Sequence, residues 1–132
     1  MATEPAKYLT YTEAVVHHIE LMRALGEVRF GIFDRALIES ALARPKHAAA
    51  YDEADLPAQA ATLCYGLIKN HPWVGGNKRT ATHLTDHFLR INGSEIRAAL
   101  AAIVEMVQSI EADLMDLTAL RRWMREHVHS LH

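Results

Sequence analysis

Several residues with the chemistry of a phosphate site follow one another near the middle of the chain, in the segment HPWVGGNKRTA at positions 71–81. Its two glycines have no Cβ, so an anion can come close to the backbone N–H groups there. Asn77, Lys78 and Arg79 are expected to open a helix, whose first N–H groups have no partner inside the helix and lie at the positive end of its dipole. With two cationic side chains added, the segment predicts a phosphate-binding loop.

His71, at the start of this segment, is the residue suited to proton transfer. The unperturbed pKa of histidine is about 6.5, so a neutral imidazole can take a proton from a nucleophile near neutral pH. Trp73 is expected to anchor the loop in the core, provided that its N–H finds a partner. A short glycine-rich turn also occurs as an ordinary helix cap, so the interpretation depends on the elements around it.

The segments on both sides of the loop are expected to be helices. Leu56–Asn70 has Asp55 as a suitable N-cap and Pro57 in its first turn. One face of this helix carries an apolar stripe, formed by Ala60, Leu63, Cys64, Leu67 and Ile68. A second stripe follows the loop at Ala81, Leu84, Phe88 and Ile91. That second helix is expected to stop at Asn92-Gly93, so the unit is helix, loop, helix.

The rest of the chain is expected to supply a helical scaffold, with no convincing strand. A capping box at Thr10 and Glu13 opens a helix over residues 10–25, and a short helix is expected over 33–43. Pro45 disfavours a helix, so residues 44–55 are expected to form a loop. Further helices are expected over 97–112 and 117–128. The apolar residues expected to be buried in these outer helices are Val15, Ile19, Met22, Leu100, Ile103, Val104, Val107, Leu120, Trp123 and Met124.

Composition favours one soluble domain. The chain has 132 residues, half of them hydrophobic, which is enough to bury a single core. Its formal net charge of −2 gives no basic footprint for nucleic acid. No apolar run has the length of a membrane span and no signal peptide is evident, so a cytoplasmic protein is expected. The single cysteine, Cys64, is expected to be a small core residue.

Two further histidines have metal-ligand spacing. His83 and His87 are four residues apart on the expected motif helix, with Asp86 beside them. The spacing places no third ligand, so we expect a polar helix surface there. His17 and His18 are adjacent in the sequence and therefore face different directions on a helix.

Several spaced segments resemble the Fic/Doc family, and within it the Doc branch of death-on-curing toxins. They are the 71–81 segment itself, LIESALARP at 37–45, YGLIKNHP at 65–72 and ING at 91–93. Because these segments occur in the family's order, the resemblance covers almost the whole chain. It implies an all-α fold, with a single domain over 1–132. That fold is a compact Fic-type bundle of about six helices, with the motif loop between two central helices.

The resemblance also implies an activity. Fic proteins transfer nucleotide-derived phosphate groups to a hydroxyl of a target protein. Lys78 stands where the full Fic signature has glycine, and Thr82 where it has a second arginine; both features are similar to Doc, whose members transfer the terminal phosphate of ATP. On this resemblance His71 is the general base for a threonine of elongation factor Tu, whose modification blocks translation. The phosphates of ATP would be held by Gly75, Gly76, Asn77, Lys78 and Arg79.

Gly75 departs from the family signature, which has an acidic residue there to bind the Mg²⁺ of the nucleotide. Asp86 lies nine residues past Asn77, or about 13 Å along a helix, too far to substitute. A site without a carboxylate lacks the ligand that Mg²⁺ prefers, so we expect weak or absent transfer while nucleotide still binds. Natural divergence and an inactivating replacement of aspartate both remain open explanations.

Regulation is expected to come from a partner. Many Fic proteins inhibit themselves with a Ser/Thr-x-x-x-Glu segment, and no glutamate of this sequence has serine or threonine four residues earlier. The resemblance therefore implies a Phd-like antitoxin, whose C-terminal helix would bind an apolar groove. Two alternatives to the kinase stay open, namely an AMP or nucleotidyl transferase acting on a protein hydroxyl, and a catalytically dead antitoxin-binding module.

Overall fold

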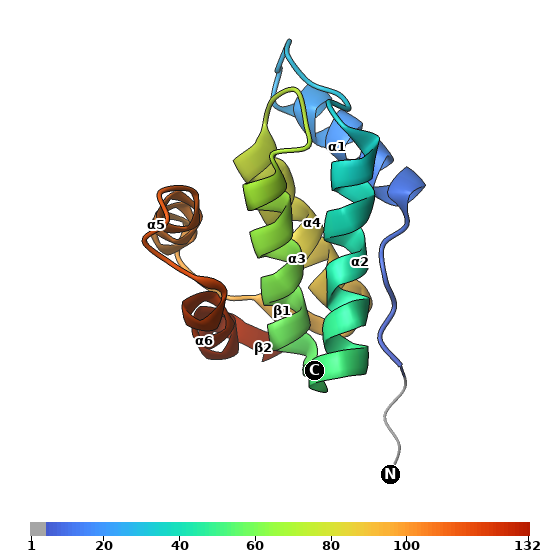
Figure 1. Cartoon of the computed structure of the whole chain (residues 1–132). Helices are drawn as coiled ribbons and strands as arrows, with labels where there is room; N and C mark the ends of the chain where they lie inside the picture. Colours follow the sequence, from blue (N-terminus) through green and yellow to red (C-terminus); the bar gives the residue numbers. More distant parts are fainter. Residues whose placement is uncertain (1–4) are drawn as a thin grey trace.

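The computed structural model describes residues 5–132 as a mostly helical protein (Figure 1). The elements in this part of the chain are α1 (Tyr11–Ala24), α2 (Arg35–Asp52), α3 (Leu56–Asn70), α4 (Asn77–Ile91), β1 (Ser94–Ile96), α5 (Leu100–Glu111), α6 (Leu117–His127) and β2 (Val128–Ser130). The expectation of a compact, mainly helical bundle is therefore confirmed.

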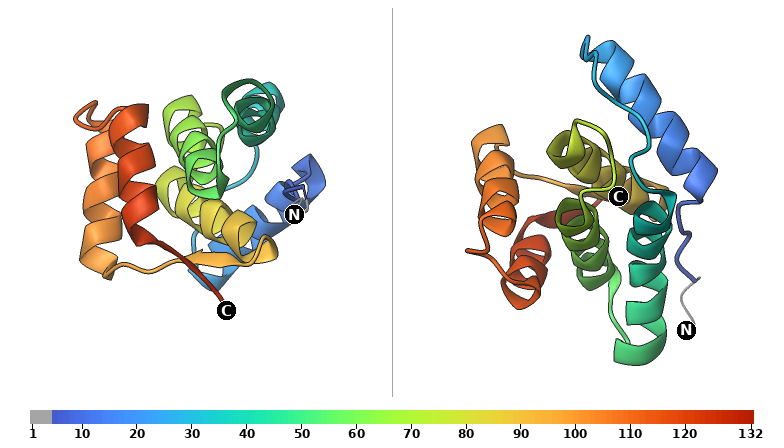
Figure 2. Two further views of the ribbon diagram at one scale, coloured as in Figure 1. Left: turned by 90° about the horizontal axis from the view of Figure 1, so that it is seen from below. Right: turned by 45° about the horizontal axis from the view of Figure 1, so that its top comes forward.

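Helix α3 is the centre of the fold. It packs against α2, α4, α5 and α6, and most of its side chains are buried. Figure 2 shows α5 and α6 side by side, next to the layer formed by α2, α3 and α4. The start of α3 is as predicted, because Asp55 accepts a hydrogen bond from the Ala58 N–H and Pro57 occupies its first turn. Since α3 leads directly into the motif loop, the best-packed helix of the protein carries the candidate site.

The loop expected over residues 44–55 is wrong, because α2 continues through Pro45 to Asp52. A proline inside a helix costs about 3 kcal/mol through a lost hydrogen bond and a clash with the preceding turn. Here Pro45 is itself buried on the face that packs against α3. That face continues the spacing of the first half of the helix, with Ile38, Ala41, Leu42 and Ala48 also buried. Burial of this stripe offsets the cost of the proline.

The expectation that the chain has no strand is also wrong. β1 and β2 pair antiparallel, with Ser94 opposite Ser130 and Ile96 opposite Val128. Each strand has only three residues, too few to show an alternating pattern in the sequence. The pairing joins the exit of α4 to the end of α6, and therefore ties the α5–α6 pair to the central helices.

Two of the residues expected in the core of α5 are exposed. Leu100 is 77% exposed and Val104 is 44% exposed, whereas the buried face consists of Met106, Val107 and Ile110. In α6, Leu120 and Met124 are buried as expected, and Trp123 is only partly buried. Helix α5 therefore presents an apolar face that no other described element covers.

Two smaller expectations, on the start of α1 and on Cys64, are confirmed. Thr10 and Glu13 form the predicted capping box of α1. Cys64 is fully buried, and burial raises the pKa of its thiol to about 12, which keeps it protonated and unreactive. Within residues 5–132, no helix combines the length and apolarity of a membrane span.

Candidate active site

The motif loop connects α3 to α4 at one end of the helical layer (Figure 1). His71 ends α3 in the left-handed conformation, with φ of 50°, and is exposed. Gly76 precedes α4 with φ of 68°, a conformation that glycine adopts without strain. No described side chain caps the start of α4. Its first N–H groups therefore have no side-chain partner among the described residues.

Asn77 fixes the shape of this loop. Its buried side chain accepts a hydrogen bond from the Trp73 N–H at 3.0 Å and donates one to the Trp73 carbonyl at 2.9 Å. Its Nδ2 also lies 3.4 Å from Nδ1 of His71, a long contact that holds the imidazole only weakly. Asn77 thus positions the loop by bonding to its backbone, a structural role in addition to the phosphate contact that the resemblance implied.

We predict that Asn77→Ala lowers the free energy of unfolding by about 2–4 kcal/mol, because it leaves both main-chain groups of Trp73 buried without their partner. Asn77→Asp is the matched comparison, since a carboxylate still accepts from the Trp73 N–H but cannot donate to the carbonyl. Urea unfolding of both variants measures the difference. Equal stability of Asn77→Ala and the unaltered protein would show that the loop does not depend on these bonds.

Trp73 anchors the loop in the core, as expected, and is only 1% exposed. Its indole N–H has no hydrogen-bond partner among the described residues, so the partner expected for it was not found. The ring instead stacks on His18, with centroids 4.1 Å apart and planes inclined by 14°.

His18 is the main site-supporting residue that the sequence did not reveal. It is fully buried, its Nε2 accepts a hydrogen bond from the Gly31 N–H at 2.9 Å, and its Nδ1 lies 2.8 Å from Oγ1 of Thr80. Because Nε2 is an acceptor, Nδ1 carries the proton and donates to Thr80. Burial lowers the pKa of His18 to about 4, so the ring is neutral at physiological pH. It joins α1, the segment before α2, and the first turn of α4.

The segment between α1 and α2, residues 25–34, lies against the motif loop. Ile32 and Trp73 form a backbone bridge, and the Val74 N–H donates to the Gly31 carbonyl at 2.9 Å. The Pro72 carbonyl accepts from the N–H groups of Phe33 and Asp34. We call residues 25–34 the covering segment. Its contacts with the loop come from main-chain groups, which leave little trace in the side-chain pattern.

The covering segment approaches Gly75 so closely that no larger residue fits there without movement. A Cβ at position 75 would overlap the main-chain carbonyl oxygen of Arg29. A Cβ at Gly76 would likewise overlap the side chain of Met22. Packing against a backbone carbonyl therefore requires glycine at position 75, whereas at position 76 the flexible end of Met22 could move and it is the positive φ that favours glycine. The space that an acidic side chain at position 75 would need is taken by the Arg29 backbone.

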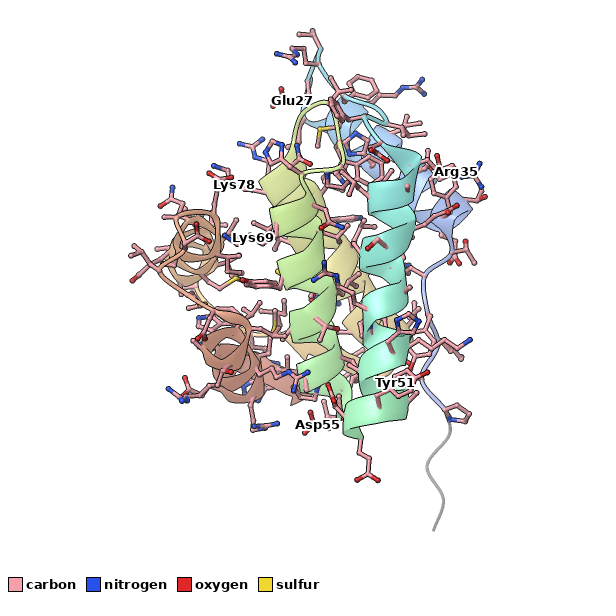
Figure 3. All side chains as sticks on the ribbon, viewed as in Figure 1. Glu27, Arg35, Tyr51, Asp55, Lys69 and Lys78 are labelled. Atoms are coloured by element: carbon pink, nitrogen blue, oxygen red, sulfur yellow. The ribbon has the colours of Figure 1, made fainter. Side chains whose placement is uncertain are left out.

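Lys78 and Arg79 project from the start of α4, and each has a carboxylate nearby. Lys78 Nζ lies 3.4 Å from Glu111 of α5, and Arg79 lies 3.8 Å from Glu27 of the covering segment. Figure 3 shows Lys78 and Glu27 at the same end of the molecule. All four side chains are substantially exposed, so these ion pairs are weak and an incoming phosphate can replace them.

A groove of about 730 Å³ extends from Lys78 and Arg79 between α4 and α5. Its apolar lining comes from Leu21, Leu25, Ile96, Leu100, Ile103, Val104 and Val107, so the end of α1 borders it as well. The exposed Leu100 and Val104 of α5 therefore line this groove. The groove is continuous with the cations of the motif, a relation that the sequence alone did not show.

The polar surface expected at His83 and His87 lies against α1. Both are partly buried beside His17 of α1, whose Nδ1 lies 3.1 Å from Nε2 of His83 and whose ring lies 4.1 Å from that of His87. Burial, followed by the nearby His17, lowers the pKa of both His83 and His87. Among the described residues no three potential ligands are arranged to hold a metal ion. His17 and His18 do face different directions, as expected.

Comparison with known proteins identifies the family of this chain. The Toxin Doc of Mycolicibacterium smegmatis is 39% identical over 80 residues, a match covering 55% of this chain and 61% of that relative. The chain thus spans about three fifths of the relative's length. The model of the Fic/DOC family matches residues 8–89, which include α1, the covering segment, the motif loop and nearly all of α4. The resemblance drawn from the sequence is confirmed: this chain belongs to the Fic/DOC family.

Proposed function

We propose that this chain is a Doc-like toxin of a toxin–antitoxin module, descended from protein kinases that transfer the terminal phosphate of ATP to a threonine of elongation factor Tu. The observation that carries the proposal is the juxtaposition of an exposed His71 with the uncapped start of α4. The relative named Toxin Doc supports the toxin assignment.

The motif loop offers the two functions that phosphoryl transfer requires of a protein, positioning and charge stabilisation. Backbone N–H groups at Gly75, Gly76 and the first turn of α4 would bind phosphate oxygens, together with Lys78 and Arg79. His71 would accept the proton of the target hydroxyl as its oxygen attacks phosphorus, and ADP would leave. Trp73 and Asn77 hold the loop in the shape that places these groups together.

The residues present do not fit Mg²⁺. Position 75 offers no carboxylate, and the Arg29 backbone occupies the space beside it. Asp86, the acidic residue further along α4, accepts hydrogen bonds from Arg90 and from the Ile96 N–H, so both of its carboxylate oxygens already have partners. We therefore assign no step to a metal, and we expect transfer by the unaltered chain to be weak or absent.

The test is intact-mass analysis of elongation factor Tu after incubation with ATP, Mg²⁺ and each of three proteins. These are the unaltered chain, Gly75→Asp, and Gly75→Asp combined with His71→Ala. We predict that only Gly75→Asp adds the mass of one phosphoryl group, and that His71→Ala abolishes the addition. Because His71 is exposed at the end of α3, its replacement should leave the melting temperature nearly unchanged.

Each other outcome has a definite meaning. Addition of an AMP group would assign nucleotidyl transfer in place of the kinase reaction. Phosphorylation by the unaltered chain would show that the acidic residue is dispensable. Activity that survives His71→Ala would remove the proposed base. If none of the three proteins modifies the factor, the kinase proposal for this target is wrong.

We further propose that the α4–α5 groove binds the helix of a Phd-like antitoxin. An apolar groove beside exposed Leu100 and Val104 suits an amphipathic helix. The rim cations Lys78 and Arg79 would favour acidic side chains in that helix.

A second candidate function, a catalytically dead antitoxin-binding module, is favoured by the packing of Arg29 against Gly75. It predicts that His71→Ala leaves antitoxin affinity unchanged and that no variant at position 75 modifies a target. The mass analysis described above separates this reading from the kinase.

A further inference from the structure

A second pocket lies at the other end of the helical layer. It has a volume of about 370 Å³ and is formed by α2, α3 and α6. Tyr51, one of its lining residues, and Lys78 of the motif loop are labelled at opposite ends of the molecule in Figure 3. The charged and aromatic lining consists of Arg44, His47, Tyr51, Asp52, Tyr65 and Arg121. Arg44 and Tyr65 belong to segments that carry the family resemblance, but the proposed transfer reaction does not use this pocket.

Arg44 is held in the pocket by packing. Its side chain crosses α3 at Gly66, where an added Cβ would lie 2.8 Å from Arg44 Cδ and 3.0 Å from its Nε. Gly66 therefore provides the space in which Arg44 lies. Within residues 5–132, Arg44 takes part in none of the side-chain hydrogen bonds or ion pairs. The residue is half-buried as a whole, and its guanidinium nitrogens are not among the buried atoms that lack a partner, so they are open to solvent and available to a ligand.

Arg121 supplies a second guanidinium with unused donors. Its Nε is buried and has no hydrogen-bond partner among the described residues. One terminal nitrogen lies 3.6 Å from the Asp52 carboxylate, whose side chain is 61% exposed. Because Asp52 is largely exposed, an ion pair at that distance contributes little to stability, and it leaves Nε of Arg121 without a partner. A buried donor without a partner is unfavourable, and an anionic ligand that accepted a hydrogen bond from it would remove this cost.

We propose that this pocket binds a small organic phosphate carrying a planar group. The pocket is lined by guanidinium groups from two helices, which are suited to phosphate oxygens, and these two cations outnumber its single carboxylate, Asp52. The aromatic rings of Tyr51 and Tyr65 offer apolar surface for the planar part of the ligand. The pocket lies within the range of about 300–1,000 Å³ that is typical of small-molecule sites.

The test is titration with phenyl phosphate, followed by NMR of the arginine Nε–H groups and of the backbone amides. Inorganic phosphate and benzoate are titrated in parallel. We expect saturable shifts at Arg44 and Arg121, with phenyl phosphate binding about tenfold or more tightly than either comparison ligand. Arg121→Gln and Arg44→Gln should each weaken binding by about tenfold or more, since each removes a charged donor. Arg122→Gln, on the exposed side of α6, is the matched control and should not change affinity.

Shifts confined to the amides of Gly75 and Gly76 would place the ligand at the motif loop and overturn the proposal. So would the absence of saturation, or equal affinity in the Arg121→Gln, Arg44→Gln and Arg122→Gln proteins. Tighter binding of benzoate than of phenyl phosphate would overturn the choice of phosphate. Circular dichroism of each variant verifies that it is folded, and the two glutamine variants on different helices give independent measurements. The outcome does not depend on the proposed kinase activity.

Discussion

Replacing His18 by alanine is expected to lower the free energy of unfolding by about 3–5 kcal/mol, a large share of the stability of a small domain. The ring is fully buried and stacked on Trp73, so its loss leaves a cavity beneath the motif loop. It also leaves the Gly31 N–H and the Thr80 hydroxyl without their shared partner. Urea unfolding at pH 7.5 measures the change.

His17→Ala is the matched control for this experiment. His17 is next in sequence but only partly buried, and its contacts are with His83 and His87. Its replacement should cost less than half as much as that of His18. Comparable losses in the two variants would mean that the bonds of His18 do not hold the covering segment and the loop together.

His18 also predicts the direction of pH dependence. Its pKa is lowered by burial to about 4 in the folded protein, and is about 6.5 in the unfolded chain. The unfolded state therefore binds the proton first, so stability is complete above pH 6.5 and falls as the pH drops toward 4. The slope in that window approaches about 1.4 kcal/mol per pH unit for one histidine. His18→Gln should reduce this slope, and the remainder should reflect His83 and His87, whose pKa values are lowered in the same direction.

The second large effect is expected at position 75. Both Gly75→Ala and Gly75→Asp should lower the free energy of unfolding by about 1–3 kcal/mol, because each adds a Cβ that overlaps the Arg29 carbonyl. The covering segment must move to admit either side chain. Thermal unfolding without nucleotide measures this steric cost, and alanine isolates it from the effect of the carboxylate.

Adding ATP and Mg²⁺ then tests the carboxylate. Gly75→Asp should gain stability that depends on Mg²⁺, about 2.7 kcal/mol at a ligand concentration one hundred times Kd. The unaltered protein and Gly75→Ala should show no Mg²⁺-dependent gain. If Gly75→Ala and Gly75→Asp are as stable as the unaltered protein in the absence of nucleotide, the covering segment moves at Arg29 without a measurable cost in free energy. If Mg²⁺ stabilises all three proteins equally, the metal does not bind through position 75.

Sequence reasoning predicted the elements whose signals are local. The caps at Thr10 and Asp55, the stripe along α3 and the glycine turn each depend on residues a few positions apart. The prediction of α2 was wrong at Pro45 because a local helix-breaking preference was outweighed by packing against α3, which the sequence of α2 does not display. The strands β1 and β2 were missed because each is short and pairs with a distant part of the chain.

The candidate site divides in the same way. His71 and the start of α4 belong to one continuous segment, so their proximity could be predicted from spacing. His18 and Arg29 reach the loop only after α1 and the covering segment have folded over it. A single histidine in an amphipathic helix does not indicate from its sequence alone that it supports a distant loop. The sequence showed that Gly75 replaces an acidic metal ligand. It could not show that the backbone carbonyl of Arg29 lies against this glycine, because Arg29 is distant in the sequence.

The bridge between Ile32 and Trp73 has a consequence for motion at the site. Backbone hydrogen bonds at Gly31, Pro72 and Val74 join the covering segment to the motif loop, so neither can open alone without breaking them. Segments joined in this way open as one cooperative unit, and such openings are rarer and slower than the fluctuations of a free surface loop. The motif loop should therefore keep one shape most of the time and should open only together with the covering segment.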